Sequence, residues 1–280
     1  MNEALQRRRE ENQEQKDEEC KKRAEELHDN DDLFTQPDSS FLGECPLCFL
    51  PMPLDPEKYR FMPCCSNLIC NGCDYAHEKS NGGDKCPFCR EPEADVEENK
   101  KRVMKRIKAN DPAAMSNMGM ELFYEGNLDS AIKYWKKAAE LGDAEAHVRL
   151  GYMYWKGEGV VKDEEKKVYH YEKAAIGGHP SARYNLGCHE HNNGNMDRAV
   201  KHFIINASLG DEDSMKGLWW HYSKGNITKE DLEATLRTHQ AALDAMKSPE
   251  REAAEAWRNE VDVAMLQRKG ERKTSEELVT

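Results

Sequence analysis

The second half of the chain repeats itself, and this repetition limits the possible folds more than any other feature. The stretch DPAAMSNMG (111–119) returns as DAEAHVRLG (143–151), HPSARYNLG (179–187) and DEDSMKGLW (211–219), at spacings of 32, 36 and 32 residues. Periods of this length are typical of solenoids, in which each unit buries its apolar face only by stacking on its neighbours. The repetition therefore predicts about four stacked units within residues 111–246.

Each unit is expected to contain two helices. Its second half carries an aromatic residue, namely Trp135, Tyr171 or Phe203, three positions after an apolar residue and four positions before an alanine. Offsets of three and four mark one face of a helix. A turn such as Gly126-Asn127 divides the unit, and small residues at fixed positions let neighbouring helices approach closely. The pattern therefore predicts a mainly α fold built from helix pairs.

These units resemble the Sel1-like repeats, which are relatives of the tetratricopeptide repeats. The second unit carries the signature loop Gly-x-Gly-Val-x-x-Asp, at Gly157, Gly159, Val160 and Asp163. The other units lack the full loop, so their assignment depends on the period, and Trp219 replaces glycine in the fourth, which predicts a capping unit. The resemblance implies an α-solenoid whose concave surface binds a protein substrate or partner.

Eight of the ten cysteines fall between residues 45 and 89, mostly as Cys-x-x-Cys. In a reducing compartment such pairs bind metal far more often than they form disulfides. Zinc takes four ligands tetrahedrally, so eight thiolates fill two closed structural sites and leave no position for a reactive water. Two Zn²⁺ per chain are therefore expected, with the ligands Cys45, Cys48, Cys64, Cys65, Cys70, Cys73, Cys86 and Cys89.

The spacing of these cysteines resembles the RING finger. In that family the pairs interleave, so that pairs one and three hold one zinc while pairs two and four hold the other. The resemblance implies one site of Cys45, Cys48, Cys70 and Cys73, and a second of Cys64, Cys65, Cys86 and Cys89.

The central pair departs from the usual RING, which has Cys-x-His before its third pair. Here Cys64 and Cys65 are adjacent, and adjacent residues can converge on one metal only in a turn. His77 is the rival of Cys65 as the eighth ligand. It lies four residues after Cys73, which would place it nearer the first site, and Cys65 is preferred.

RING ligases hold a charged conjugating enzyme and ubiquitin in a reactive pose, and they act by positioning without a covalent intermediate. Three features that such ligases tend to carry are present: Leu47 in the first knuckle, Pro87 in the last, and Arg90 after the last ligand. Each also has a simpler interpretation: Leu47 and Pro87 can pack the zinc loops, and Arg90 can be a surface charge. The resemblance implies an E3 ubiquitin ligase that binds a ubiquitin-conjugating enzyme, with a non-catalytic zinc-binding scaffold as the alternative.

Composition limits the remaining function classes. The net charge of -12 disfavours non-specific binding to nucleic acid, which needs a positive surface. No stretch is apolar enough for a membrane span, and the first residues lack the apolar core of a secretory signal. We therefore expect a cytoplasmic protein, with the basic end of residues 93–110 as a candidate nuclear import signal.

Three other groups of residues are interpreted more simply. Cys188, His189 and His191 cannot share one helix face, so no metal site is expected at CHEH (188–191). The aromatic residues at repeat positions are expected in the core, although part of WWHY (219–222) is dense enough to be an exposed partner surface. Those core aromatics include Trp135, Tyr154 and Trp219.

The order of segments, including RIKANDPAAMSNMG and AMKSPEREAAEAWR, resembles a group of diatom proteins that join a RING finger to Sel1-like repeats. The resemblance covers roughly residues 41–258. We expect a small two-zinc cross-brace finger followed by an α-solenoid. The expected segments are a charged helical or disordered segment (1–40), the finger (41–92), a connecting helix (93–110), about four repeats (111–246) and a C-terminal tail (247–280), helical to about Lys269.

Overall fold

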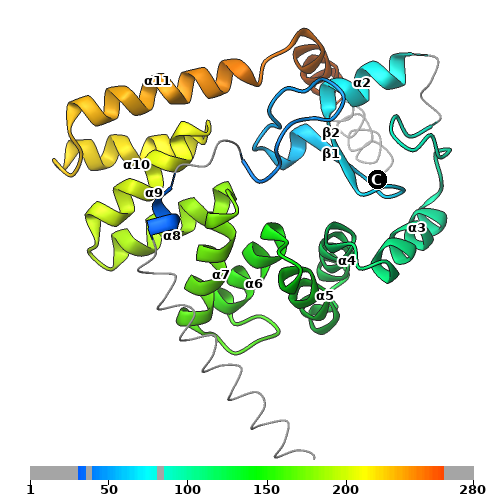
Figure 1. Cartoon of the computed structure of the whole chain (residues 1–280), viewed down its shortest axis with the longest axis horizontal. Helices are drawn as coiled ribbons and strands as arrows, with labels where there is room; N and C mark the ends of the chain where they lie inside the picture. The colour runs from blue at the N-terminus through cyan, green and yellow to red at the C-terminus, as the bar shows by residue number, and fades with distance from the viewer. Residues whose placement is uncertain (1–30, 36–39, 81–84, 262–280) are drawn as a thin grey trace, which may run out of the picture.

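The computed structural model describes residues 31–35, 40–80 and 85–261 of the chain. Predictions for residues 1–30 and 262–280 fall outside the described residues. Helices dominate the described part, which confirms the fold class expected from the period. They follow one another in a curved row, and the cysteine-rich segment lies on the inner side of the curve (Figure 1).

Consecutive helices pack as pairs along the row. The most extensive packing joins α4 to α5, α6 to α7, and α8 to α9, and each pair then packs against the next. The bounds of the helices are α3 (Val96–Lys108), α4 (Pro112–Tyr124), α5 (Leu128–Glu140), α6 (Ala144–Lys156), α7 (Glu164–Ile176), α8 (Pro180–Asn192), α9 (Met196–Ser208), α10 (Glu212–Ser223) and α11 (Lys229–Ala245), followed by a helix over 249–261.

In the first, second and fourth units, the aspartate that opens the unit explains where its first helix begins. Asp111, Asp143 and Asp211 accept hydrogen bonds from backbone N–H groups two or three residues later, at 2.7–3.2 Å. These bonds satisfy donors that have no partner within the helix. Gly126 has a φ of 80°, in the left-handed region that favours glycine, and Asn127 then caps α5. Local sequence therefore sets the division into helix pairs.

A glycine and an aromatic ring hold each of the first three pairs together. A methyl group added to the glycine would lie only 2.5–2.6 Å from the nearest atom of the ring. The bare backbone therefore lets the ring lie flat against the first helix, and the pair packs closely. This contact explains why the same two residue types recur at the repeat period. The contacts are Gly119 with Trp135, Gly151 with Tyr171, and Gly187 with Phe203.

The fourth unit differs at this contact. Trp219 occupies the glycine position and is 49% exposed. A large side chain at this position removes the space in which the ring of the second helix lies in the other units. Helix α11 packs more extensively on α9 than on its own partner α10. The expectation that repeat aromatics lie in the core is confirmed for Trp135 and Tyr154 and is wrong for Trp219.

The cysteine-rich segment forms a small hairpin and one helix. It contains η2 (Pro56–Lys58), β1 (Tyr59–Met62), β2 (Asn67–Cys70) and α2 (Asn71–Lys79). The two strands are antiparallel, with Tyr59 opposite Cys70 and Met62 opposite Asn67. Two small apolar clusters, each containing cysteines, make up its interior. So small a core needs an additional source of stability.

This segment contacts the row of helices from the inside. The ring of Phe41 stacks on the ring of His179 at a centroid distance of 4.1 Å. The backbone N–H of Phe41 donates to the carbonyl oxygen of Gly178 at 3.2 Å. Burial and the neighbouring Glu145 carboxylate raise the pKa of Tyr59 to about 12, where β1 approaches α6. The inner surface of the row, expected to bind a partner, is therefore partly covered by the chain itself.

The charged segment over residues 1–40 was expected to be helical or disordered, and residues near its described end contribute to the core. The short helix η1 (Asp31–Phe34) packs against α7 and α9. Leu33 is 0% exposed because it fills a space between α6, α7 and α8. The many charges that precede Leu33 conceal this contact at the level of composition.

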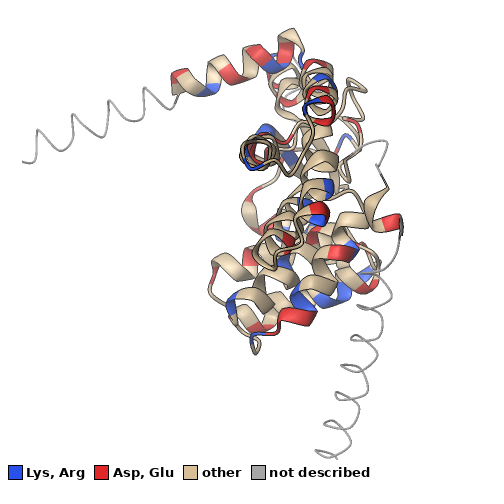
Figure 2. Cartoon of the chain, turned by 90° about the vertical axis from the view of Figure 1, so that its left-hand side faces the viewer, with Lys and Arg blue, Asp and Glu red and all other residues tan. Residues whose placement is uncertain are grey.

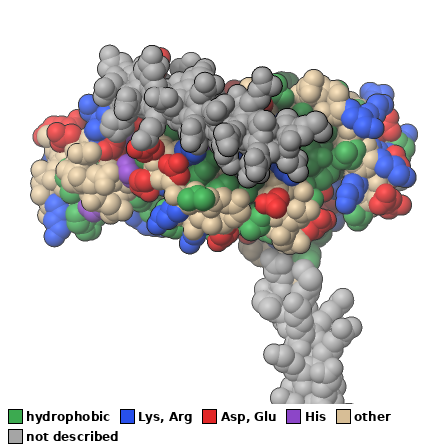
Figure 3. All heavy atoms as spheres, turned by 90° about the horizontal axis from the view of Figure 1, so that it is seen from below, with side chains coloured by type: hydrophobic (Ala, Val, Ile, Leu, Met, Phe, Trp, Pro, Cys, Tyr) green, Lys and Arg blue, Asp and Glu red, His purple; other side chains and the backbone are tan. Residues whose placement is uncertain are grey.

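The outer surfaces of the helices carry mixed side chains. Lys and Arg are interspersed with Asp and Glu on the helices that face the viewer in Figure 2. Seen from below, hydrophobic side chains lie in separate groups among charged ones (Figure 3). Among the described helices, none is both long and apolar enough to cross a membrane.

Candidate metal centre

The eight cysteines lie in two clusters, each built from two pairs that are distant in sequence. Within each cluster the four sulfur atoms all lie within 4.8 Å of one another. The pairs interleave, as the resemblance to the RING finger implied, so each cluster joins the two halves of the segment. The clusters are Cys45, Cys48, Cys70 and Cys73, and Cys64, Cys65, Cys86 and Cys89.

The sulfur positions fit a tetrahedral metal. Three of the sulfur–sulfur distances between the two cysteine pairs of a cluster are 3.8 Å, two in the first cluster and one in the second. Four thiolates placed tetrahedrally at about 2.3 Å from a zinc ion would be about 3.8 Å from one another. Tetrahedral sites of four thiolates are typical of zinc and of iron–sulfur chemistry. The sulfur positions of both clusters are therefore compatible with a metal of this kind.

The electrostatics of the clusters also favour a cation. Burial raises the pKa of Cys73 to about 12 and raises that of Cys64 as well. In the first cluster, hydrogen bonding from Cys70 lowers the pKa of Cys45 to about 4. A thiolate is thus favoured at Cys45, whereas burial favours the protonated thiol at Cys73. A divalent cation can take the place of those protons and stabilise four thiolates together.

The first and last pairs lie in the same kind of turn. Their sequences are CPLCFLP and CPFCREP, and the residue after the second cysteine has a left-handed backbone in both, with φ of 57° at Phe49 and 59° at Arg90. The N–H of Phe49 donates to the carbonyl of Cys45 at 2.8 Å, and that of Arg90 to Cys86 at 2.9 Å. The turn directs both sulfurs of a pair toward one point.

The adjacent cysteines occupy the turn between β1 and β2. Cys64 and Cys65 lie within this turn, which closes with the N–H of Ser66 donating to the carbonyl of Met62 at 2.8 Å. Ser66 has a φ of 56°, so the chain reverses sharply after the pair. The turn brings both sulfurs into the second cluster. Two adjacent cysteines can converge on one metal only in such a turn.

His77 lies outside both clusters. Its Nε2 atom is 2.6 Å from the carbonyl oxygen of Lys85, a hydrogen bond that ties α2 to the start of the last knuckle. Cys65 is the residue that the structure places with the second cluster. Of the two alternatives for the eighth ligand, the geometry favours Cys65.

The three residues that the RING resemblance implied for conjugating-enzyme binding are all at least partly accessible. Leu47 is 36% exposed on the first knuckle, Pro87 is half-buried on the last, and Arg90 is exposed beside it. Phe49, which sequence reasoning missed, is 71% exposed two residues after Leu47. Its position corresponds to that of Arg90 in the CPxC pattern, a similarity that could have identified it.

Arg251 is the second residue that sequence reasoning missed. It lies on the helix over 249–261, and its Nη2 atom donates toward the sulfur of Cys48 at 3.6 Å. Its Nη1 atom donates to the carbonyl oxygens of Pro51 and Met246 at 2.8 and 2.7 Å. A methyl group on Gly72 would lie 2.7 Å from Arg251, so α2 approaches this helix closely. A guanidinium at this position offsets the negative charge of a four-thiolate site.

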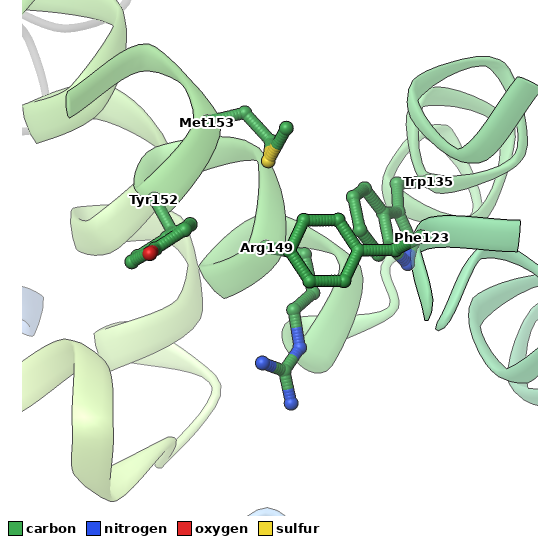
Figure 4. Close-up of a pocket in the computed structure, with 5 residues that line it drawn as sticks. All are labelled: Phe123, Trp135, Arg149, Tyr152 and Met153. Carbon is green, nitrogen blue, oxygen red and sulfur yellow. The ribbon is translucent and has the colours of Figure 1, made fainter. Parts of the chain in front are cut away.

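A cavity of about 290 Å³ lies between the first two helix pairs. In Figure 4 the guanidinium of Arg149 points away from Met153, and it pairs with Glu145 at 2.5 Å. The residues that line the cavity provide neither a set of metal ligands nor an acid–base pair, so they suggest packing and not catalysis. They are Phe123, Trp135, Arg149, Tyr152 and Met153.

Comparison with solved structures finds chains that are similar to part of this one. A Sel1 repeat protein from Oxalobacter formigenes is 23% identical, with a TM-score of 0.46, over 63% of this chain and 80% of that one. The protein c5321, a protective antigen of uropathogenic Escherichia coli strains that displays an SLR fold, is 23% identical with a TM-score of 0.45. That match covers 52% of this chain and 34% of c5321.

Comparison with protein families identifies the repeats. Among curated proteins, none matches this chain. The family model described as the Sel1 repeat matches residues 112–143, 144–179 and 180–211, which span α4 to α9 and lie outside the cysteine-rich segment. The match agrees with the helix pairs and with the shared glycine–aromatic contact. Residues 112–211 therefore match the Sel1 repeat as three consecutive units.

Proposed function

We propose that the cysteine-rich segment is a RING-type finger with two structural zinc ions, and that the chain is an E3 ubiquitin ligase whose repeats bind a protein substrate. The observation that carries the proposal is the pair of interleaved four-cysteine clusters. Zinc is the proposed metal because it is redox-inert and is commonly held by four thiolates in structural sites. Four protein ligands leave each ion without an open position, so the zinc ions hold the shape of the finger.

The finger's own residues would act by positioning. Leu47 offers an apolar contact to a conjugating enzyme, and the five N–H donors of Arg90 can hydrogen-bond both the enzyme and ubiquitin. Restricting the thioester-linked ubiquitin to a reactive pose lowers the entropic barrier to its transfer. Transfer to a lysine of a substrate then needs no nucleophile from this chain. The Sel1 repeats would bring that substrate to the finger.

The alternative is a zinc-stabilised scaffold without ligase activity. Two observations favour it: the family match covers the repeats alone, and the first cluster is packed against the chain's own helix over 249–261 through Arg251. In this case the finger would fix the geometry of the chain, and Leu47 and Arg90 would have no catalytic consequence.

Ubiquitin discharge from a panel of charged conjugating enzymes onto free lysine distinguishes the two functions. For a ligase, wild type accelerates discharge, and Arg90→Ala lowers the acceleration about ten-fold or more, because a hydrogen bond from a charged group contributes about 1.5–3 kcal/mol. Leu47→Ala is expected to act in the same direction. Arg237→Ala removes an exposed arginine from α11 and serves as the control. Absence of acceleration across the panel, from protein that holds two zinc ions, would support the scaffold.

A further inference from the structure

A short segment near the N-terminus lies on the Sel1 repeats in the manner of a bound peptide. Helix η1 (Asp31–Phe34) contacts α7 and α9, although more than 100 residues separate it from them in sequence. It appears as the short blue element beside α8 and α9 in Figure 1. We call the space that holds Leu33 and Phe34 the segment pocket.

The floor of the segment pocket is apolar. Leu33 is 0% exposed and belongs to one hydrophobic cluster with residues of three helices. Alanines at the repeat positions of α7 and α8 leave room for a branched side chain. The side chains of the cluster around Leu33 are Val148, Tyr171, Ala174, Ala175, Ala182 and Leu186.

A buried arginine in the pocket hydrogen-bonds to the main chain of the segment. Arg183 on α8 is 1% exposed, and its guanidinium donates to the carbonyl oxygen of Leu33 and, at 3.4 Å, to that of Thr35. Burial lowers the pKa of Arg183 to about 10. A buried charge is costly unless it is hydrogen-bonded, and here the acceptors come from the segment. Carbonyl acceptors are present in any peptide, so this part of the recognition does not depend on the segment's sequence.

Cations surround the aromatic side chain of the segment. The guanidinium of Arg198 lies 4.8 Å from the ring centroid of Phe34, and the Nζ of Lys201 lies 5.2 Å from it. The ring of His202 is 4.9 Å away. Cations over an aromatic face are attracted to its negative potential. Arg198 is held in place by Glu190, which accepts from its Nε at 2.6 Å.

We propose that the segment pocket is a peptide-binding site of the Sel1 repeats, and that it takes a Leu-Phe segment of a partner protein in competition with Leu33 and Phe34. The pocket supplies an apolar hole for leucine, a cationic face for the aromatic ring and an arginine for two main-chain carbonyls. An acidic residue before the leucine, as in DDLF, suits these cations. The chain's own segment is tethered, so it competes at a high effective concentration and raises the affinity that a partner needs.

The inference rests on the partner-binding role proposed for the repeats and is independent of ligase activity. The probe is the fluorescent peptide DNDDLFTQP, residues 29–37 of the chain. Full-length Leu33→Ala/Phe34→Ala protein is expected to bind the peptide at least ten-fold more tightly than wild type, because its pocket is not filled by the tethered segment. If this double variant does not fold, Phe34→Ala alone serves, because Phe34 is only half-buried.

Three controls make the result specific. A peptide with alanine in place of leucine and phenylalanine is expected not to bind, and Arg183→Met in the emptied protein should weaken binding at least ten-fold. Lys216→Met, an exposed change on α10, should leave binding unaltered. Folded, emptied protein that binds no better than wild type, or binding that ignores Arg183, would overturn the proposal. Ubiquitin discharge onto free lysine bypasses the pocket, so failure of the ligase proposal would be seen separately.

Discussion

Removal of metal by a chelator is expected to unfold residues 41–92 and to leave helices α4 to α11 folded. Structural zinc contributes on the order of 10 kcal/mol of folding free energy per site in small fingers. The apolar clusters of this segment are too small to replace that contribution. The Sel1 repeats have their own core, centred on residues such as Trp135 and Leu150, and it contains no metal ligand.

Three signals separate these outcomes. Far-ultraviolet circular dichroism should retain most of its helical signal, while the eight thiols of the two clusters become reactive toward a thiol reagent. The fluorescence of Trp257 should change, because its ring lies 5.8 Å from that of Tyr75 on α2. Loss of the helical signal in parallel with the metal would show that the finger and the repeats fold as one unit.

Replacing Trp135 with alanine is expected to destabilise the repeats by about 3–5 kcal/mol, the range for large aromatic residues in a core. Trp135 is 1% exposed, and its Nε1 donates to the carbonyl of Ser116 at 3.2 Å. The variant loses this bond and leaves the backbone of Gly119 facing a void. Urea unfolding followed by circular dichroism measures the change in the free energy of unfolding.

Trp155→Ala provides the matched control. It removes the same side chain from α6 at a position that is 45% exposed. Its effect should be within about 1 kcal/mol, because exposed residues lose little burial. Equal destabilisation by the two substitutions would contradict the role assigned to the glycine–aromatic contact.

The repeats could be predicted from the sequence because their contacts follow from local patterns. The glycine and aromatic positions represented by Gly151 and Tyr171 recur with the period, because the glycine contacts the aromatic ring in each of the first three units. Asp143 at the start of a unit is a helix cap, and its role is visible from its place before an apolar pattern. The grouping of the cysteines was implied by a known spacing, and the turn at Cys64 supplies the geometry that the adjacent pair required.

The remaining contacts could not be predicted because they depend on the curvature of the whole row. Arg251 reaches Cys48 across 203 residues, and no local pattern connects the two. Leu33 follows a strongly charged stretch, so its burial becomes evident only once α6, α7 and α8 are in place. Trp219 shares the repeat period but occupies the position that is glycine in the other units, so the period alone misplaced it in the core.

We propose that two closed four-thiolate zinc sites hold the finger together. Elemental analysis combined with zinc X-ray absorption tests this proposal most directly. Two zinc ions per chain are expected, each with four sulfur neighbours at about 2.3 Å. Cys65→Ser is expected to impair one site, while His77→Ala leaves both intact. Fewer than two zinc ions in the wild-type protein, or a nitrogen ligand that disappears in His77→Ala, would contradict the proposal.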